Sequence, residues 1–154
     1  MEEKSLGRQV AAESFGSLFL VATIIGSGMM GDNLSPDDGV ALLGNALATW
    51  GILYVLITSL CPISGAHLNP LVSCAAFLKQ SMTFGKLSLF CAAQVGGGIV
   101  GAYVAHGMFM ERNNEFHGED RDTYGEFFAE IVATVGLLCC IAGFIAAKAD
   151  VAMG

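Results

Sequence analysis

Four long apolar blocks constrain this chain more than any other feature. They cover residues 10–31, 39–61, 87–110 and 127–147, and the second block contains no charged residue. Each block is long enough to cross a hydrocarbon core of about 30 Å as a helix. With 54% hydrophobic and only 14% charged residues, a water-soluble globule would lack the polar surface to cover itself. The sequence therefore predicts an all-α integral membrane protein with four spans in a lipid bilayer.

The charged residues lie mostly between these blocks and indicate an orientation. The net charge of −7 is concentrated in the connections 31–39 and 110–126, so it does not indicate a nucleic-acid partner. Lysine and arginine are enriched on the cytoplasmic side of membrane proteins, so we expect a cytoplasmic N-terminus and a place in the plasma (inner) membrane. The basic residues on the N-terminal side of the spans are Lys4, Arg8, Lys79, Lys86 and Lys148, against Arg112 and Arg121 on the other side.

A shorter apolar segment, LNPLVSCAAFL, lies between the second and third spans and is too short to cross. Pro70 suits the first turn of a helix and Asn69 is a good N-cap, so we expect a half-helix over 69–79. Pro62 predicts a break after the second span, followed by extended residues 63–67. Irregular backbone at membrane depth is tolerated where it lines a wet cavity, which favours a re-entrant loop. A plain cytoplasmic loop before a short surface helix is the alternative.

The first and fourth spans open alike, with AAESFG in one and FAEIVA in the other. The two copies lie three spans apart, so the second is inverted relative to the first, as in inverted-repeat transport proteins. Carboxylates at membrane depth tend to face a polar interior. Glu13 and Glu130 are therefore expected to accept hydrogen bonds from the N–H groups of the re-entrant loop. The alternative places both near the membrane surface, in the first turns of their helices.

No catalytic, metal or cofactor site is predicted. Ser64, His67 and the two glutamates form no plausible triad, so an enzyme is not expected. The cysteines lack CxxC or Cys/His ligand spacing and are expected to be ordinary buried thiols. They are Cys61, Cys74, Cys91, Cys139 and Cys140.

Three groups of residues together resemble the aquaporin and aquaglyceroporin family, the major intrinsic proteins. They are SGAHLNP at 64–70 with its following helix, the Ala-Glu openings of the first and fourth spans, and Gln94 within QVGGGIVG. The resemblance covers about residues 8–147 and implies the N-terminal portion of an aquaporin-like right-handed helical bundle. It also implies a homotetramer in which each subunit carries its own pore for water or small neutral solutes.

The resemblance assigns roles within this motif. The family's pore has two half-helices, each beginning Asn-Pro-Ala, that meet at mid-membrane. The resemblance implies that Asn69 donates its amide hydrogen to the passing solute and that Pro70 starts the half-helix. It also implies that the cytoplasmic vestibule is lined by the carbonyls of Gly65, Ala66 and His67. The positive end of the half-helix would oppose cations and protons.

The sequence departs from the family pattern in two ways. Leu71 stands where the family usually has Ala, which should change the packing where the two half-helices meet. The chain also stops at Gly154, before a fifth span, a second half-helix and a sixth span. We therefore expect a single partial domain over 1–154, with four spans and one re-entrant half-helix.

The second span contains a candidate selectivity position, and the third contains a face of small residues. The family's spacing back from Asn69 puts the span-two selectivity position at Thr49, with Trp50 adjacent as either the true register or a packing residue. Gly97 and Gly101, with Ala105 beyond them, form a face of small residues that is typical of close helix packing.

These observations favour an aquaporin-like channel subunit that passes water or a small neutral solute such as glycerol, truncated before the second half-pore. The alternative is a non-conducting truncated membrane protein that only assembles with other subunits. A third hypothesis, an ion-coupled transporter with Glu13 and Glu130 as carriers, would require flux that depends on a proton or sodium gradient.

Overall fold

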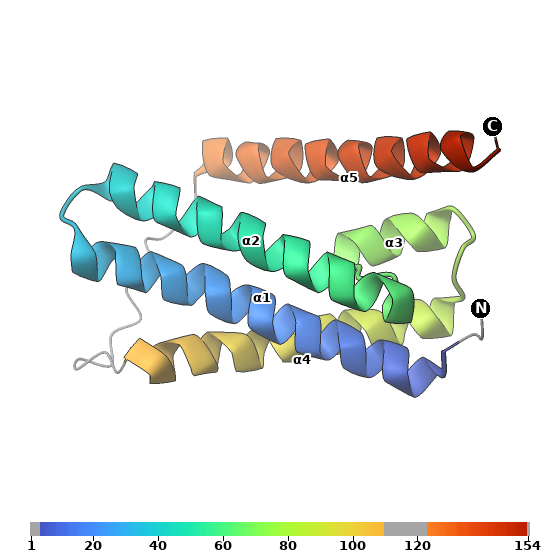
Figure 1. Cartoon of the computed structure of the whole chain (residues 1–154), viewed down its shortest axis with the longest axis horizontal. Helices are drawn as coiled ribbons and strands as arrows, with labels where there is room; N and C mark the ends of the chain where they lie inside the picture. The colour runs from blue at the N-terminus through green and yellow to red at the C-terminus, as the bar shows by residue number, and fades with distance from the viewer. Residues whose placement is uncertain (1–3, 110–122, 154) are drawn as a thin grey trace. The chain divides into compact units, whose positions relative to one another are not determined.

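The computed structural model describes residues 4–109 and 123–153, and every element in those ranges is a helix (Figure 1). The helices are α1 (Leu6–Leu34), α2 (Asp38–Ser64), α3 (Pro70–Leu78), α4 (Phe84–Phe109) and α5 (Tyr124–Met153). The predicted all-α class is confirmed. The chain divides into two compact units, residues 1–114 and 115–154, and each is considered by itself.

Helices α1, α2 and α4 are each long and apolar enough to cross a membrane. Within the second unit, α5 contains a shorter apolar segment at 127–143, inside the block predicted as the fourth span. The chain is therefore an integral membrane protein. The four-span count remains a prediction.

The first unit is built around α1, which packs against both α2 and α4, while α3 packs against α4. A small apolar cluster formed by Ala12, Leu56, Leu60 and Leu68 joins α1, α2 and the residues just before α3. The core of this unit therefore lies beside the segment that connects α2 to α3.

Helices α1 and α4 approach each other closely through glycine. A Cβ atom at Gly97 would lie 2.2 Å from the carbonyl oxygen of Ser14, and one at Gly101 would lie 2.3 Å from that of Leu18. Both glycines therefore permit contacts that no larger residue allows. The predicted close packing of this small-residue face is confirmed, and the paired numbers show that α1 and α4 run parallel.

Helices α1 and α2 run antiparallel and meet in a tight turn. Asp37 caps α2 by accepting a 2.8 Å hydrogen bond from the Gly39 N–H through its side chain. Further along, the Asn45 side-chain amide donates to the Ile24 carbonyl at 2.7 Å. This second bond ties two adjacent helices together inside their apolar length.

The predicted break at Pro62 is wrong, and so is the extended conformation predicted for residues 63–66, because residues 63 and 64 are helical and Gly65 and Ala66 have positive φ. Helix α2 continues through Pro62 to Ser64, and the Gly65 N–H still bonds the Cys61 carbonyl at 3.1 Å. A proline so near the end of a helix removes one backbone hydrogen bond and leaves the rest of the turn intact.

The prediction that the cysteines are buried is also wrong for three of them. Cys61, Cys139 and Cys140 are exposed, and Cys74 and Cys91 are half-buried. An apolar segment of a membrane protein need not be interior, because its outward face meets lipid.

Basic and acidic side chains gather at opposite ends of the first unit. The basic residues Lys4, Arg8, Lys79 and Lys86 lie at the starts of α1 and α4 and the end of α3, whereas Asp32, Asp37 and Asp38 lie at the turn between α1 and α2. Because α1 and α4 run parallel and α2 returns antiparallel, these two groups occupy opposite ends. The two basic residues predicted on the opposite side of the membrane, Arg112 and Arg121, lie outside the described residues.

Candidate functional site

The segment between α2 and α3 folds with unusual backbone angles. Gly65 ends α2 in the left-handed region with φ 94°, and Ala66 and Leu68 follow with φ 49° and 50°. Non-glycine residues in this region cost on the order of 1–3 kcal/mol each and persist where their surroundings hold them. The loop at 65–69 therefore requires external support.

That support comes from Glu13 of α1, which is fully buried at 0% exposure. Its Oε1 accepts from the Ser64 hydroxyl at 2.5 Å and the His67 N–H at 3.0 Å. Its Oε2 accepts from the Leu68 N–H at 2.7 Å and the Gln94 side-chain amide at 2.8 Å. A carboxylate offers acceptors only, and here every contact is a donor. One side chain of α1 thus holds the end of α2, the loop and α4.

A second layer of polar contacts continues from Gln94. Its side-chain amide also donates to the Ser73 hydroxyl at 3.0 Å, and Ser73 lies 3.0 Å from the His67 Nδ1. Ser73 has 0% exposure and Gln94 has 3%. The His67 ring also stands edge-on to Phe90, with ring centroids 5.6 Å apart. The network therefore joins α3 and α4 to the loop and fixes the His67 ring.

Helix α3 begins where the Asn-Pro pair is. Asn69 has extended backbone angles and is the N-cap, and its side-chain oxygen accepts from the Leu71 N–H at 2.7 Å. Pro70 occupies the first helical turn, where its missing N–H costs nothing. This bond fixes the Asn69 amide plane, and so the direction of its NH₂ group.

Most of the candidate residues lie in the short segment between α2 and the start of α3. Gly65, Ala66, His67, Asn69 and Pro70 are consecutive or nearly so, and the Glu13 network adjoins them. Leu71, the unusual residue of the motif, is 51% exposed.

Two other candidate residues lie away from this segment. Thr49 is in the middle of α2, and its hydroxyl is buried without a hydrogen-bond partner among the described residues. The adjacent Trp50 is 70% exposed and stacks on Tyr54. Glu130 lies in α5, in the second unit.

Sequence reasoning did not single out Ser64, Ser73 and Gln94 as site residues. A glutamine inside an apolar span is a signal, because polar side chains there usually hydrogen-bond to neighbouring helices. The two serines carried no such signal, since serine is common near helix ends. No group of three metal-ligating His, Cys, Asp or Glu side chains occurs in the described part of the chain.

Apolar helices long enough to cross a membrane, with a short helix packed against one of them and a buried carboxylate that holds its entry loop, define an α-helical membrane protein. The chain matches the family described as major intrinsic protein over residues 1–154. It therefore belongs to the major intrinsic protein family, as the sequence motif predicted.

Relatives of known name are similar to most of this chain. Aquaglyceroporin AqpS of Rhizobium meliloti (strain 1021) is 40% identical over 141 residues, which is 92% of this chain and 60% of the relative. Aquaporin PIP2-3 of Zea mays is 35% identical over 149 residues, covering 87% of this chain and 52% of the relative. The chain thus spans between half and three-fifths of the length of these two relatives.

Proposed function

We propose that this chain supplies half of a pore for the passive passage of water or a small neutral solute such as glycerol. Membership of the major intrinsic protein family supports this, as do relatives named aquaglyceroporin and aquaporin. The observation that carries the proposal is the orientation of the peptide groups in the loop before α3.

Three successive N–H groups of this loop are directed to one side. The Ala66 N–H donates to the Ser64 hydroxyl at 3.1 Å, and the His67 and Leu68 N–H groups donate to Glu13. In a trans peptide the carbonyl points away from the N–H of the same plane, and the described residues contain no cis bond. The carbonyls of residues 65, 66 and 67 are therefore directed away from Glu13. A row of such acceptors can replace part of a solute's hydration shell.

Asn69 and α3 complete the proposed half-pore. The Asn69 oxygen is engaged by the Leu71 N–H, so its NH₂ group is the part of the amide available to donate to a solute. Pro70 starts the helix at this point, and the helix N-terminus carries a partial positive charge of about half an elementary charge. That potential would oppose cations while leaving neutral solutes unaffected.

The proposal also covers a selectivity residue, a second carboxylate, the oligomeric state and the orientation in the membrane. Thr49, with its buried and unpartnered hydroxyl, is the proposed selectivity residue of the second span, and Trp50 is the packing residue. Glu130 is proposed, as predicted from the sequence, as a loop-buttressing carboxylate. The proposed channel is a homotetramer in the plasma (inner) membrane with a cytoplasmic N-terminus, an orientation that the clustering of Lys4, Arg8, Lys79 and Lys86 supports.

Reconstituted flux tests the proposal. Residues 1–154 contain one Asn-Pro pair and so offer one half-helix. A version extended by a second aquaporin-like half, placed in liposomes, should give osmotic water or glycerol flux above the lipid background in stopped-flow light scattering. Residues 1–154 alone should give none, because one wall of carbonyls and one dipole do not enclose a pore.

A matched pair of asparagine variants makes the test specific. Asn69→Asp should abolish most of the flux, because it replaces the donor with an acceptor at the pore. Asn33→Asp changes an exposed residue at the far end of α1 and should leave flux unchanged. Equal flux from the two variants would refute the role of Asn69. Extended protein that inserts and folds but conducts nothing would favour the non-conducting alternative.

A further inference from the structure

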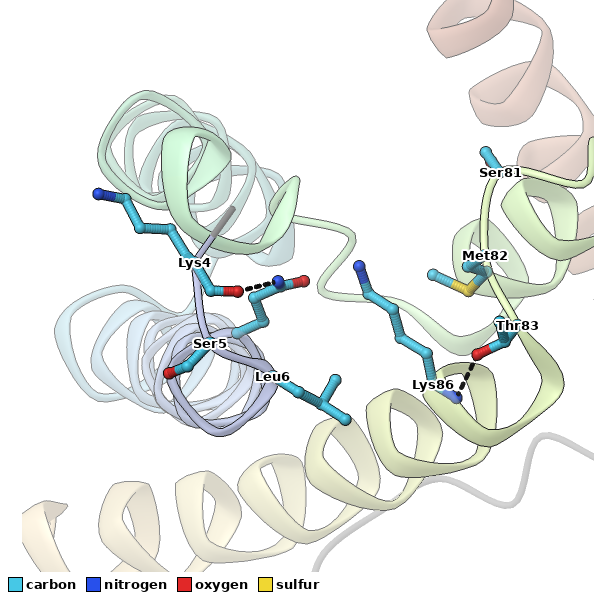
Figure 2. Close-up of a pocket in the computed structure, with 8 residues that line it drawn as sticks. Lys4, Ser5, Leu6, Ser81, Met82, Thr83 and Lys86 are labelled. Atoms are coloured by element: carbon cyan, nitrogen blue, oxygen red, sulfur yellow. Dashed lines mark hydrogen bonds between the residues drawn. The ribbon is translucent and has the colours of Figure 1, made fainter. Parts of the chain in front are cut away.

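A polar pocket of about 500 Å³ lies at the basic end of the first unit, and its lining includes none of residues 65–70 (Figure 2). It forms between the start of α1 and the turn that leads from α3 into α4. Its lining is Lys4, Ser5, Leu6, Gln9, Ser81, Met82, Thr83 and Lys86. A volume of this size is in the range of small-molecule sites, roughly 300–1,000 Å³.

Positive charge dominates this lining. It contains two lysines, three hydroxyl side chains and no acidic residue. The first turns of α1 and α4, which both begin here, also contain no acidic residue. Each helix start adds its partial positive charge. Glu2 and Glu3 precede Lys4 in the sequence and lie outside the described residues.

Lys86 is the residue that reaches into the pocket. Figure 2 shows its side chain extending between α1 and residues 81–83, whereas the Lys4 ammonium turns away from that space. The Lys86 ammonium lies 5.2 Å from the centre of the Phe90 ring. Phe90 has 0% exposure, so this contact positions the cation against a fixed ring. An ammonium group resting on a ring face still has N–H donors for an anion.

The other walls of the pocket are held in place by hydrogen bonds. The Gln9 side chain, 7% exposed, donates to the Lys4 carbonyl at 2.6 Å and so fixes the start of α1. Thr83 accepts from the Lys86 N–H at 3.3 Å, and Ser81 donates to the Ala76 carbonyl at 2.7 Å. The cavity is therefore formed by anchored backbone and not by freely moving side chains.

We propose that this pocket binds a phosphate group, with Lys86 as its principal cationic contact. Phosphate is favoured by ammonium groups, hydroxyl donors and helix starts. The group could come from two sources, an anionic phospholipid headgroup of the surrounding bilayer or phosphate free in solution. In the proposed orientation the basic end of the first unit, which holds this pocket, faces the cytoplasm, where membranes carry anionic lipids.

Native mass spectrometry of the purified chain in detergent tests this with a short-chain phosphatidic acid and the matching phosphatidylcholine. Phosphatidic acid should be retained in preference to phosphatidylcholine. Lys86→Met should weaken its retention by about fivefold, in keeping with the contribution of one lysine to anionic-lipid attraction. Lys4→Met should weaken it less. Lys79→Met is the matched control, because Lys79 is an exposed lysine at the same end but outside the pocket.

The outcomes distinguish a lipid headgroup from free phosphate, and both from a pocket that binds no phosphate through Lys86. Phosphatidic acid binding that inorganic phosphate does not displace assigns the site to a lipid headgroup, and displacement at similar concentration assigns it to free phosphate. Either result supports the proposal if Lys86→Met weakens it. Equal retention by Lys86→Met and Lys79→Met would overturn it. If Lys86→Met does not fold, two other variants test the same pocket: Lys86→Arg is expected to retain binding, and Thr83→Val, which removes a hydroxyl that only accepts among the described residues, is expected to weaken it. Water flux in the extended protein does not enter this result, so the two proposals fail separately.

Discussion

Helix α1 is held by two kinds of contact. At the loop before α3, the fully buried Glu13 side chain accepts four hydrogen bonds, two from the loop, one from the end of α2 and one from Gln94 of α4. Toward α4, one residue further along, Ser14 and then Leu18 meet Gly97 and Gly101 through direct backbone contact. The first contact depends on matched donors and acceptors, and the second depends on the absence of side chains.

The difference follows from the solvent. In lipid, apolar side chains gain little by leaving their surroundings, so helices associate through close packing and hydrogen bonds between helices. Packing suffices where two regular helices meet, because their own backbone bonds are complete. An irregular loop has unpaired N–H groups and needs acceptors. The two contacts should therefore respond to different substitutions, the first to changes of polarity and the second to changes of volume.

The largest effect is expected at Glu13. Glu13→Leu leaves the His67 and Leu68 N–H groups and the Gln94 amide without their acceptor, and each such loss costs about 1–3 kcal/mol. Glu13→Gln keeps one acceptor oxygen and should be milder. The free energy of unfolding, measured by titrating the detergent-solubilised chain with dodecyl sulfate, should fall in the order native, Gln, Leu. Equal and negligible changes in both variants would show that the loop does not depend on this carboxylate.

A smaller loss is expected from added volume at the second contact. Gly97→Ala places a methyl group against the Ser14 backbone, which must move, at a cost of roughly 1–3 kcal/mol. Gly96→Ala is the matched control, because a Cβ there has nothing within 4 Å. That control should be neutral or stabilising by about 0.4–1 kcal/mol. The same titration measures both, and indistinguishable variants would mean that α1 and α4 are not in close contact.

The smallest effect concerns the outer layer of the polar network. Ser73→Ala removes one partner from both His67 and Gln94 and should cost about 1 kcal/mol of unfolding free energy. Ser88→Ala, at an exposed serine of α4 that bonds only its own helix at Phe84, should change little. If polarity governs this side of α1, Ser73→Ala combined with Glu13→Gln should cost less than the sum of the two single changes. Strict additivity would place Ser73 outside the network.

What the sequence predicted correctly depends on neighbouring residues. The Asn69-Pro70 pair indicates a helix start because capping uses groups only a few residues apart, and α3 begins there. The small-residue face at Gly97 was visible from helical spacing alone. Apolar blocks were sufficient for the all-α class.

The errors and omissions have a common origin in distant contacts. The donors to Glu13 stand 51 to 81 residues further along the chain, and no local pattern pairs Gln94 with that carboxylate. The break expected at Pro62 failed because its neighbours Cys61 and Gly65 still close the last turn. Exposure of the cysteines depends on which helix face meets lipid, and apolar composition does not determine that.

The buried carboxylate also has a consequence for how the chain is made. Helix α1 is synthesised before α2 and α4, and the Ser64 hydroxyl and Gln94 amide follow 51 and 81 residues later. When α1 leaves the translocon, its carboxylate has none of its four donors, and an ionisable group in an apolar span opposes insertion by several kcal/mol. The hydrogen bonds that offset this cost form only when α2, the loop and α4 arrive. Retention of α1 in the bilayer and assembly of the first unit are therefore coupled steps of biogenesis.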